Sequence, residues 1–225
     1  MTKSIAIIPA RGGSKRIPKK NIKFFHGQPL IAYSIKAAQE SGLFDKIVVS
    51  TDDEEIANVA QSYGAEVLKR PKELADDFTG TGAVVEHTLS IYKGYNFCCT
   101  IYATAPLLQA KYLYEGLEKL QNSDAVMAFS VTSMPFPIQR TFKIKEGRCE
   151  MFTPEYFSTR SQDLEEAYQD AGQFYWEKVG VKMNDIPFGR DSIPIILPRH
   201  MVQDIDTLED WKRAELMYRV LEEMK

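Results

Sequence analysis

Short apolar runs and amphipathic stretches alternate over the first 131 residues of the chain. Apolar runs rich in β-branched residues predict strands, and stretches with an apolar position every three or four residues predict helices. The runs that predict strands cover residues 4–9, 45–51, 65–70, 95–103 and 124–131. The stretches that predict helices cover residues 29–42, 52–64, 81–94 and 109–123. This order predicts an α/β fold with a mostly parallel sheet covered by helices on both faces.

The alternation stops after the fifth predicted strand. Residues 138–154 predict two short antiparallel strands joined by a turn at Glu146 and Gly147. Residues 160–173 are polar and predict irregular structure. We therefore expect an inserted arm at about residues 135–172, because this stretch is too short to be a second domain.

The rest of the chain returns to the main domain. Residues 174–181 predict one more strand, and residues 206–224 predict a closing amphipathic helix. No internal repeat or linker interrupts the sequence. The expected organisation is a single domain over residues 1–225 that carries the arm as an insertion.

One predicted helix start carries two neighbouring acids. Thr51 and Glu54 have the spacing of a capping box before the second helix. Asp52 and Asp53 lie at the same start, where a carboxylate caps backbone N–H groups and stabilises the helix dipole. We therefore expect this acidic pair to be structural rather than to bind a metal.

Composition narrows the class of protein. The chain has 225 residues, of which 44% are hydrophobic, so it buries a sizeable core. A net charge of −3 argues against a nucleic-acid partner, and the lack of a long apolar run or leader argues for a cytoplasmic protein without a membrane anchor. Cys98, Cys99 and Cys149 are odd in number and two are adjacent, so we expect neither disulfides nor a metal knuckle.

The loop after the first strand concentrates positive charge. Its sequence, ARGGSKRIPKKNIK, contains two glycines and no carboxylate, and its cations are Arg11, Lys15, Arg16, Lys19, Lys20 and Lys23. Ligands in doubly wound sheets bind beyond the carboxyl ends of strands, and glycines let backbone N–H groups approach phosphate oxygens. The planar fork of Arg11 and the mobile charge of Lys20 suit a polyphosphate. The alternative is a solvated basic turn.

The loop matches neither the phosphate-binding pattern GxxxxGK[ST] nor the dinucleotide pattern GxGxxG. This argues against an ATPase and against a dehydrogenase. The segment IIPARGGSKRIPKKNI instead resembles the signature of CMP-sugar synthetases. The similarity continues through PLIAYSI, VVSTDDEEIA, RPKELADDFTGT, YATAPLL and DIDTLEDW, and so spans nearly the entire chain. The segments FPIQRTF and RSQDLEEAYQDAGQFYW resemble the branch of this family that acts on pseudaminic acid.

The resemblance implies a Rossmann-like nucleotidyltransferase sandwich with a small dimerisation arm. It also implies an enzyme that transfers CMP from CTP to the anomeric hydroxyl of a 2-keto nine-carbon sugar acid and releases pyrophosphate. Such products serve the synthesis of bacterial surface glycans, including flagellin glycosylation. Synthesis of CMP-sialic acid or CMP-legionaminic acid is the alternative, and a non-catalytic nucleotide- or sugar-binding module is a further one.

The resemblance also implies the nucleotide site. The matching positions are Ala10, Arg11, Gly12, Ser14, Lys20, Asn21, Arg70 and Thr81. Among them Arg11 and Lys20 would hold the triphosphate and act in catalysis, and Arg70 would help to recognise cytidine. Without the resemblance, a salt bridge from Arg70 to Glu73 or Asp76 would be the better interpretation.

Two carboxylates match the family's metal ligands. Asp204 and Asp206 lie two apart in QDIDT, and on a strand this spacing places both on one face. Oxygen ligands that bridge to phosphates suit Mg²⁺, with Mn²⁺ as an alternative, and Asp204 joins the implied catalytic residues. Asp206 also precedes Glu209 by three residues, so it could cap the last helix instead. No side chain stands out as a general base.

The sugar site and the oligomer rest on the arm and the late strand. The candidate sugar-binding residues are Gln139, Arg140, Arg160, Gln162 and Gln173. Arg140 or Arg160 could pair with the sugar carboxylate, and the glutamines could bind hydroxyl and acetamido groups. Sialic-acid synthetases typically carry NGAIY where this chain reads DAGQFYW, so Gln173 favours the pseudaminic substrate. The family's arm typically builds a dimer, which implies a homodimer here.

Overall fold

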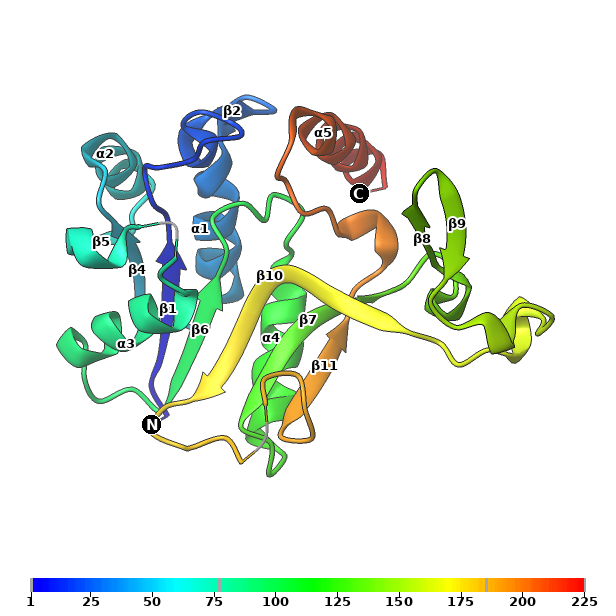
Figure 1. The fold of residues 1–225 in the computed structure, drawn as a ribbon. Coiled ribbons are helices and arrows are strands. Elements are labelled where there is room, and N and C mark those ends of the chain that lie inside the picture. The colour runs from blue at the N-terminus through cyan, green and yellow to red at the C-terminus, as the bar shows by residue number, and fades with distance from the viewer. Residues whose placement is uncertain (1, 77, 185, 225) are drawn as a thin grey trace.

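The computed structural model describes residues 2–76, 78–184 and 186–224. A seven-stranded sheet forms its centre, in the order β11-β7-β10-β6-β1-β4-β5 (Figure 1). The strands are β1 (Ser4–Pro9), β4 (Lys46–Thr51), β5 (Glu66–Lys69), β6 (Phe97–Ile101), β7 (Met127–Ser133), β10 (Tyr168–Lys178) and β11 (Ser192–Ile196). Only β10 runs antiparallel to its neighbours in this sheet. The predicted α/β fold with a mostly parallel sheet is confirmed.

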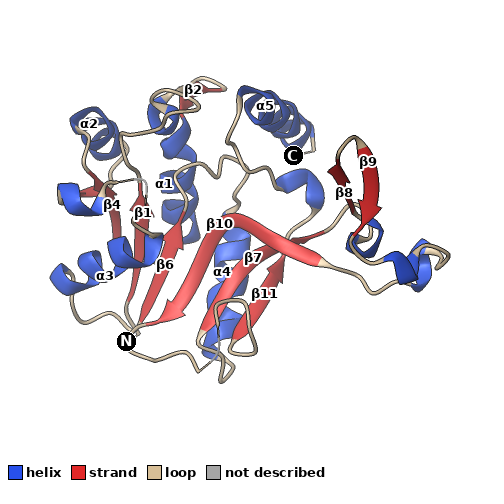
Figure 2. Cartoon of the chain, viewed as in Figure 1, coloured by secondary structure: helices blue, strands red, loops and turns tan. Residues whose placement is uncertain are grey.

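Helices cover both faces of the sheet, as Figure 2 shows in blue. They are α1 (Leu30–Ser41), α2 (Glu54–Ser62), α3 (Thr81–Ile91), α4 (Ala110–Gln121) and α5 (Leu208–Glu223). Side chains on a strand alternate between faces, and β1 shows this directly. Ala6 and Ile8 pack in the core cluster that α1, α2 and α4 share, whereas Ile5 and Ile7 pack with Val85 of α3.

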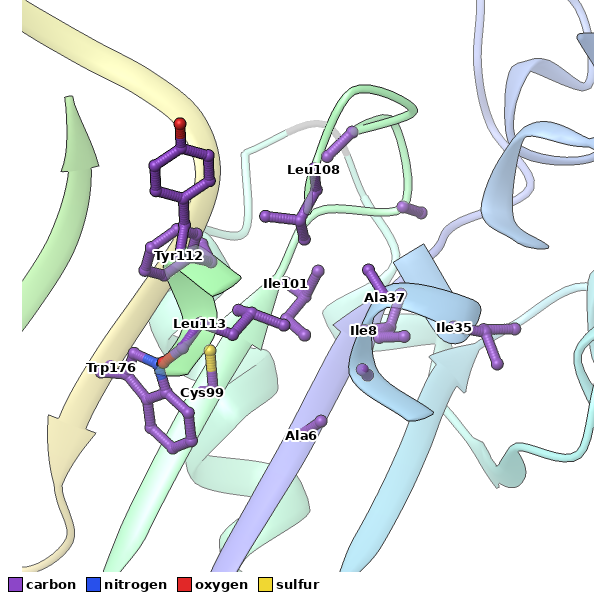
Figure 3. Packing of buried hydrophobic residues seen from close by; sticks show 14 of the residues in the cluster. Ala6, Ile8, Ile35, Ala37, Cys99, Ile101, Leu108, Tyr112, Leu113 and Trp176 are labelled. Atoms are coloured by element: carbon purple, nitrogen blue, oxygen red, sulfur yellow. The ribbon is translucent and has the colours of Figure 1, made fainter. Parts of the chain in front are cut away.

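The larger core lies between the sheet and α1, α2 and α4, and Figure 3 shows part of it around Ile8 and Leu113. Trp176 of β10 is fully buried, stacks on Phe44 and donates its indole N–H to the Leu113 carbonyl at 3.0 Å. A Cβ on Gly116 would lie 2.8 Å from the Trp176 ring. The backbone of α4 therefore packs directly on β10 and fixes the position of that strand.

The order of the strands places a ligand site beside β1. From β1 the chain builds outward through β4 and β5, and then returns to the other side of β1 as β6. The crevice at the carboxyl end of β1 is thus the point where the strand order reverses, which is where open α/β sheets bind ligands. The basic loop begins at this point, directly after Pro9.

Two features of the sheet differ from the sequence prediction. The predicted irregular segment 160–173 is wrong in its last part, because Tyr168, Gln169 and Asp170 already pair with β7. A register shift between Asp170 and Tyr175 marks a bulge, and this extra length hides the strand period in the sequence. Strand β11 was not predicted. Its Pro194 removes a backbone donor, which an edge strand tolerates.

The remaining elements are short. The strands β2 (Phe24–Phe25) and β3 (Gln28–Pro29) pair with each other, as do β8 (Phe142–Lys145) and β9 (Arg148–Met151). Short 3-10 helices are η1 (Lys20–Ile22), η2 (Lys72–Leu74), η3 (Ile138–Arg140), η4 (Pro154–Tyr156), η5 (Ser161–Asp163) and η6 (Arg199–Met201). No helix of the described residues is both long and apolar enough to cross a membrane.

The arm lies between the end of β7 and the start of β10, and it projects away from the sheet (Figure 1). The predicted hairpin is confirmed. Glu146 and Gly147 join β8 to β9 and both have positive φ, which suits a two-residue hairpin turn. The apolar side chains of the arm are largely exposed, among them Phe136, Phe142, Ile144, Phe152 and Phe157.

The helix caps differ from the predicted ones. Asp53 is the N-cap of α2 and accepts hydrogen bonds from Glu55 and Ile56, so the prediction for Asp53 is confirmed. The predicted capping box of Thr51 and Glu54 is wrong, since Thr51 lies two residues before the N-cap and accepts from the Asp53 N–H instead. Asp52 does not cap α2 either. Its carboxylate accepts a hydrogen bond from the Gly12 N–H of the basic loop.

Candidate active site

A cavity of about 550 Å³ opens at the carboxyl end of β1. Segments that are distant in sequence meet around it: the basic loop, the stretch between β5 and α3, the end of β6, and the loop before α5. Among the residues singled out from the sequence, those that line it are Arg11, Ser14, Lys15, Arg16, Lys20, Asn21, Arg70, Thr81 and Asp206, whereas Gly12 and Asp204 do not. Ala10 is buried directly beneath the loop. The structure therefore brings most of the predicted nucleotide site together.

The basic loop has a defined backbone. Ala10 donates to the Ser50 carbonyl at 2.9 Å and so continues the pairing of β1 with β4. The buried Asn21 side chain donates to the Arg11 carbonyl at 3.0 Å and closes the loop across its base. Ile17 is buried between these ends and anchors the middle. The loop is therefore not a free turn, and four of its six cations, Arg11, Lys15, Arg16 and Lys20, line the cavity.

Arg11 crosses the cavity entrance to the stretch after β5. Its guanidinium donates to the Asp76 carbonyl at 2.6 Å. The Asp76 carboxylate accepts from Phe78 and Thr79, and the hydrogen bonds of Thr79 are the main reason why the Asp76 pKa is lowered. The charge of Arg11 adds a smaller lowering of the same pKa. This contact joins the two segments that flank the cavity.

Arg70 is a cation buried in the wall of the cavity, with 6% of its surface exposed. It donates to the Ser50 carbonyl at 2.7 Å and to the Ser50 hydroxyl at 3.3 Å. Burial lowers its pKa, and the nearby charge of Asp52 opposes that shift. Among the described residues it forms no ion pair with Glu73 or Asp76, so the salt-bridge interpretation is wrong.

The two late carboxylates lie in the loop between η6 and α5. The expectation that they share a strand is wrong. Ile205 between them is nevertheless buried, whereas Asp204 and Asp206 are both more exposed. Asp206 lies 2.8 Å from Arg16 and 3.5 Å from Lys20 and faces the cavity. Burial raises the pKa of Asp204, and the charge of Asp206 raises it further. The two acids are therefore close enough to repel each other.

Asp206 does not cap the last helix. The N-cap of α5 is Thr207, whose hydroxyl accepts from the Asp210 N–H while the Asp210 carboxylate accepts from the Thr207 N–H. The predicted cap formed by Asp206 and Glu209 is wrong by one residue. The Asp206 carboxylate is thus left for the cavity and its cations.

The donor set fits a magnesium ion that is completed by phosphates. Within the described residues no group of three or more acidic, histidine or cysteine side chains forms a closed metal cage. Mg²⁺ bound to nucleotides usually takes only one or two carboxylates and keeps water and phosphate oxygens as its other ligands. Asp206 lines the cavity and Asp204 does not, but together they would supply those two carboxylates, and a cation would relieve the repulsion between them.

The predicted sugar-binding residues fall into two groups. Gln173 of β10 lies behind the cavity wall, because its carbonyl accepts from the N–H of the cavity-lining Tyr102 at 2.9 Å. Its buried amide donates to the Met201 carbonyl, and its side-chain oxygen has no hydrogen-bond partner. The residues Gln139, Arg140, Arg160 and Gln162 lie in the arm and do not line the cavity of their own chain.

The arm residues make local contacts instead. The Gln139 amide donates to the Glu165 carbonyl at 3.0 Å, and Arg160 lies 2.7 Å from Asp163. Arg140 donates to the Thr159 carbonyl. These contacts stabilise the fold of the arm, and they leave its face exposed.

Sequence reasoning missed other residues that line the cavity, namely Thr79, Tyr102 and Thr104. Tyr102 and Thr104 directly follow β6, which neighbours β1 in the sheet. Polar residues at the carboxyl end of a strand beside the switch point are the signal that could have identified them.

The family model for cytidylyltransferases matches residues 5–192, so the chain belongs to the cytidylyltransferase family. The chain is 44% identical over 225 residues to the pseudaminic acid cytidylyltransferase of Campylobacter jejuni strain 81-176, with 97% of each chain covered. It is 34% identical to the N-acylneuraminate cytidylyltransferase of Escherichia coli O18:K1:H7, covering 95% of this chain and 51% of that protein. The resemblance to CMP-sugar synthetases is confirmed.

A solved structure shows the same fold. The chain superposes on CMP:2-keto-3-deoxy-manno-octonic acid synthetase in complex with CTP with a TM-score of 0.72, at 15% identity, covering 97% of this chain and 99% of that one. The nucleotidyltransferase fold expected from the sequence is therefore confirmed.

Proposed function

We propose that the chain transfers CMP from CTP to the anomeric hydroxyl of pseudaminic acid and releases pyrophosphate. The observation that carries the proposal is the convergence of Arg11, Lys20 and Asp206 on one cavity whose wall contains the buried Arg70. Arg11 and Lys20 would bind the triphosphate, and Asp206 would bind a cation held by the nucleotide. Arg70 would supply a fixed donor for the polar base. The 44% identity to a pseudaminic acid cytidylyltransferase supports the choice of sugar.

The reaction needs position and charge neutralisation more than a covalent enzyme intermediate. The sugar hydroxyl attacks the α-phosphorus, and pyrophosphate leaves in line with it. Arg11 and Lys20 stabilise the charge that develops on the departing pyrophosphate, since both border the cavity. Ser14 and the loop N–H groups hold phosphate oxygens, while Arg70 and Thr81 orient the pyrimidine.

Asp204 and Asp206 would hold Mg²⁺, or Mn²⁺ in its place. Such an ion would neutralise phosphate charge and polarise the reacting phosphoryl group. Before CTP binds, Arg16 and Lys20 neutralise Asp206 through the contacts described above. When CTP binds, Arg16 and Lys20 would exchange these internal ion pairs for contacts to phosphate.

The sugar site extends from the cavity towards β10. Gln173 is buried behind the cavity wall, and our proposal is that its unpartnered side-chain oxygen helps to select groups at the far end of the sugar. The arm residues could contact a sugar only if the arm of one subunit reaches the cavity of another. These residues are Gln139, Arg140, Arg160 and Gln162. We therefore include a homodimer in the proposal, because the exposed apolar side chains of the arm need a covering surface.

Release of pyrophosphate tests the proposal. The purified protein is mixed with Mg²⁺ and pseudaminic acid, and CTP is compared with UTP at equal concentration. The expected result is rapid release with CTP, little with UTP, and none without the sugar. Binding of CTP without any turnover would leave only a nucleotide-binding module, and a preference for UTP would reject the cytidylyltransferase proposal. Because CTP is a cytoplasmic metabolite, we place the reaction in the cytoplasm.

A further inference from the structure

The start of α2 holds the phosphate loop at both of its ends. The Gly12 N–H donates to an Asp52 carboxylate oxygen at 3.0 Å, and the Lys19 ammonium lies 2.5 Å from Glu55. Asp52 and Glu55, which we call the acidic clamp, thus bracket the part of the loop that carries Ser14, Lys15 and Arg16. Asp53 lies between them and is occupied as the N-cap of the helix.

The backbone at both anchors is under tight constraint. A Cβ on Gly12 would lie 2.7 Å from a carboxylate oxygen of Asp53, so the loop packs directly against the helix start. Lys19 has φ of 53°, in the left-handed region that side-chain-bearing residues seldom adopt. A conformation of this kind persists where surrounding contacts hold it, and here the Lys19 carbonyl accepts hydrogen bonds from the N–H groups of Ile22 and Lys23, to which the exposed ion pair with Glu55 adds a little.

Asp52 occupies an unexpected place for a carboxylate. It lies beside a loop built to bind a polyanion, and Coulomb repulsion between like charges opposes binding. Its side chain does not line the cavity. It does lie near the buried Arg70, whose charged form it favours. Asp52 can therefore favour the reaction in two ways, through the position that its hydrogen bond imposes on the loop or through its charge beside Arg70, and the hydrogen bond is the direct contact with the loop.

We propose that Asp52 is a positioning residue for CTP, which fixes the phosphate loop against α2 through its hydrogen bond to the Gly12 N–H. This inference rests on the proposed function and adds a residue to its machinery. Because the hydrogen bond needs an acceptor oxygen and not a charge, asparagine at this position keeps the contact and removes the repulsion. Alanine removes both.

Asp52→Ala and Asp52→Asn therefore separate position from charge. In steady-state kinetics, Asp52→Ala raises KM for CTP by up to about tenfold, the upper value of one ordinary hydrogen bond, and leaves KM for the sugar acid unchanged. Asp52→Asn keeps KM for CTP at or below the wild-type value. Both variants keep a melting temperature within about 2 °C of wild type, because the side chain is exposed.

Glu54→Ala is the matched control. Glu54 lies at the same helix start and pairs with Lys69 on the exposed side at 3.2 Å, away from the loop. It should leave KM for CTP unchanged. The rate of backbone amide hydrogen exchange in residues 10–20 can be measured without turnover. Among the three variants, only Asp52→Ala should increase this rate.

The outcomes distinguish this inference from the proposed function. A wild-type protein that does not consume CTP rejects the proposed function, while faster amide exchange in Asp52→Ala alone still supports the positioning role. If Asp52→Ala matches wild type in both KM for CTP and amide exchange, the positioning role is rejected. It is also rejected if Asp52→Asn is as impaired as Asp52→Ala, because the charge would then be the active feature.

Discussion

The Lys20 ammonium lies 3.5 Å from a carboxylate oxygen of Asp206 and 2.5 Å from the Ile205 carbonyl. The two charged residues are 186 positions apart in the chain, so this contact joins the phosphate loop to the loop that precedes α5. Lys20 is only 17% exposed. Its charge is therefore held next to the cavity before any nucleotide binds, and little rotamer freedom remains to be lost on binding.

Loss of either loop cation should impair catalysis far more than stability. Arg11→Ala and Lys20→Ala each remove a donor that faces the departing pyrophosphate, so kcat/KM should fall about 100-fold or more. The free energy of unfolding should fall by no more than about 1–2 kcal/mol, because each variant loses one or two hydrogen bonds at the edge of the core. Kinetics and thermal melts measure both, and the exposed Lys93→Ala is the control. Near-normal turnover in both variants would reduce the loop to a solvated turn.

The two late carboxylates predict a metal requirement. Activity should need Mg²⁺ or Mn²⁺ and disappear with a chelator. Asp204→Asn and Asp206→Asn should each raise the metal concentration at half-maximal rate or abolish turnover, with little change in melting temperature, because Thr207 and Asp210 cap α5. Glu209→Gln, in the exposed first turn of the same helix, is the control. Undiminished activity in the chelator would contradict the metal site.

Gly12 should tolerate no side chain. In Gly12→Ala the new Cβ would lie 2.7 Å from Asp53, so the loop must move away from α2. We expect a lower affinity for CTP in calorimetry, while the melting temperature changes little because the loop contributes little to the core. Gly82→Ala is the control, since a Cβ there meets no atom within 4 Å. Equal affinity in the two variants would show that the loop position does not matter.

The arm should form a homodimer. Its hairpin exposes 74% of Ile144 and 54% of Phe142, and an isolated hairpin is marginal in water. Light scattering at micromolar concentration should give twice the 25.6 kDa of one chain. Ile144→Glu should shift the mass towards one chain, whereas Ile91→Glu on α3 should not. An active protein with the mass of a single chain would mean that the arm serves its own subunit.

The sequence predicted well the parts of the fold in which burial dominates. The strands β1, β4 and β6 are apolar because both of their faces are covered, so short apolar runs identified them. Residues 168–173 were misassigned because a bulge and an exposed polar stretch mask the period of β10. The edge strand β11 contains Pro194, and a proline within a sequence normally argues against a strand.

The candidate site divides in the same way. Arg11 and Lys20 could be found from the sequence because their loop directly follows a strand at the switch point. The burial of Arg70 and the pairing of Asp206 with Arg16 depend on contacts between segments that are distant in sequence, which no local pattern reveals. The contact of Asp52 with Gly12 is of the same kind, since the sequence alone indicated a helix cap.

The choice of sugar depends on the far end of the molecule, where pseudaminic and sialic acids differ. Sialic acid ends in a glycerol tail, whereas pseudaminic acid has a deoxy, methyl-ended tail and a second acylamino group. Apolar contacts discriminate by about 1–3 kcal/mol, and an unpaired buried polar group such as the Gln173 oxygen adds more.

The measurement is a competition assay with CTP, Mg²⁺ and equal amounts of pseudaminic, legionaminic and sialic acids, in which mass spectrometry identifies the CMP-sugars formed. CMP-pseudaminic acid should dominate, and Gln173→Ala should weaken this preference more than it lowers CTP affinity. Equal or greater formation of CMP-sialic acid or CMP-legionaminic acid would contradict the assignment of pseudaminic acid as the substrate.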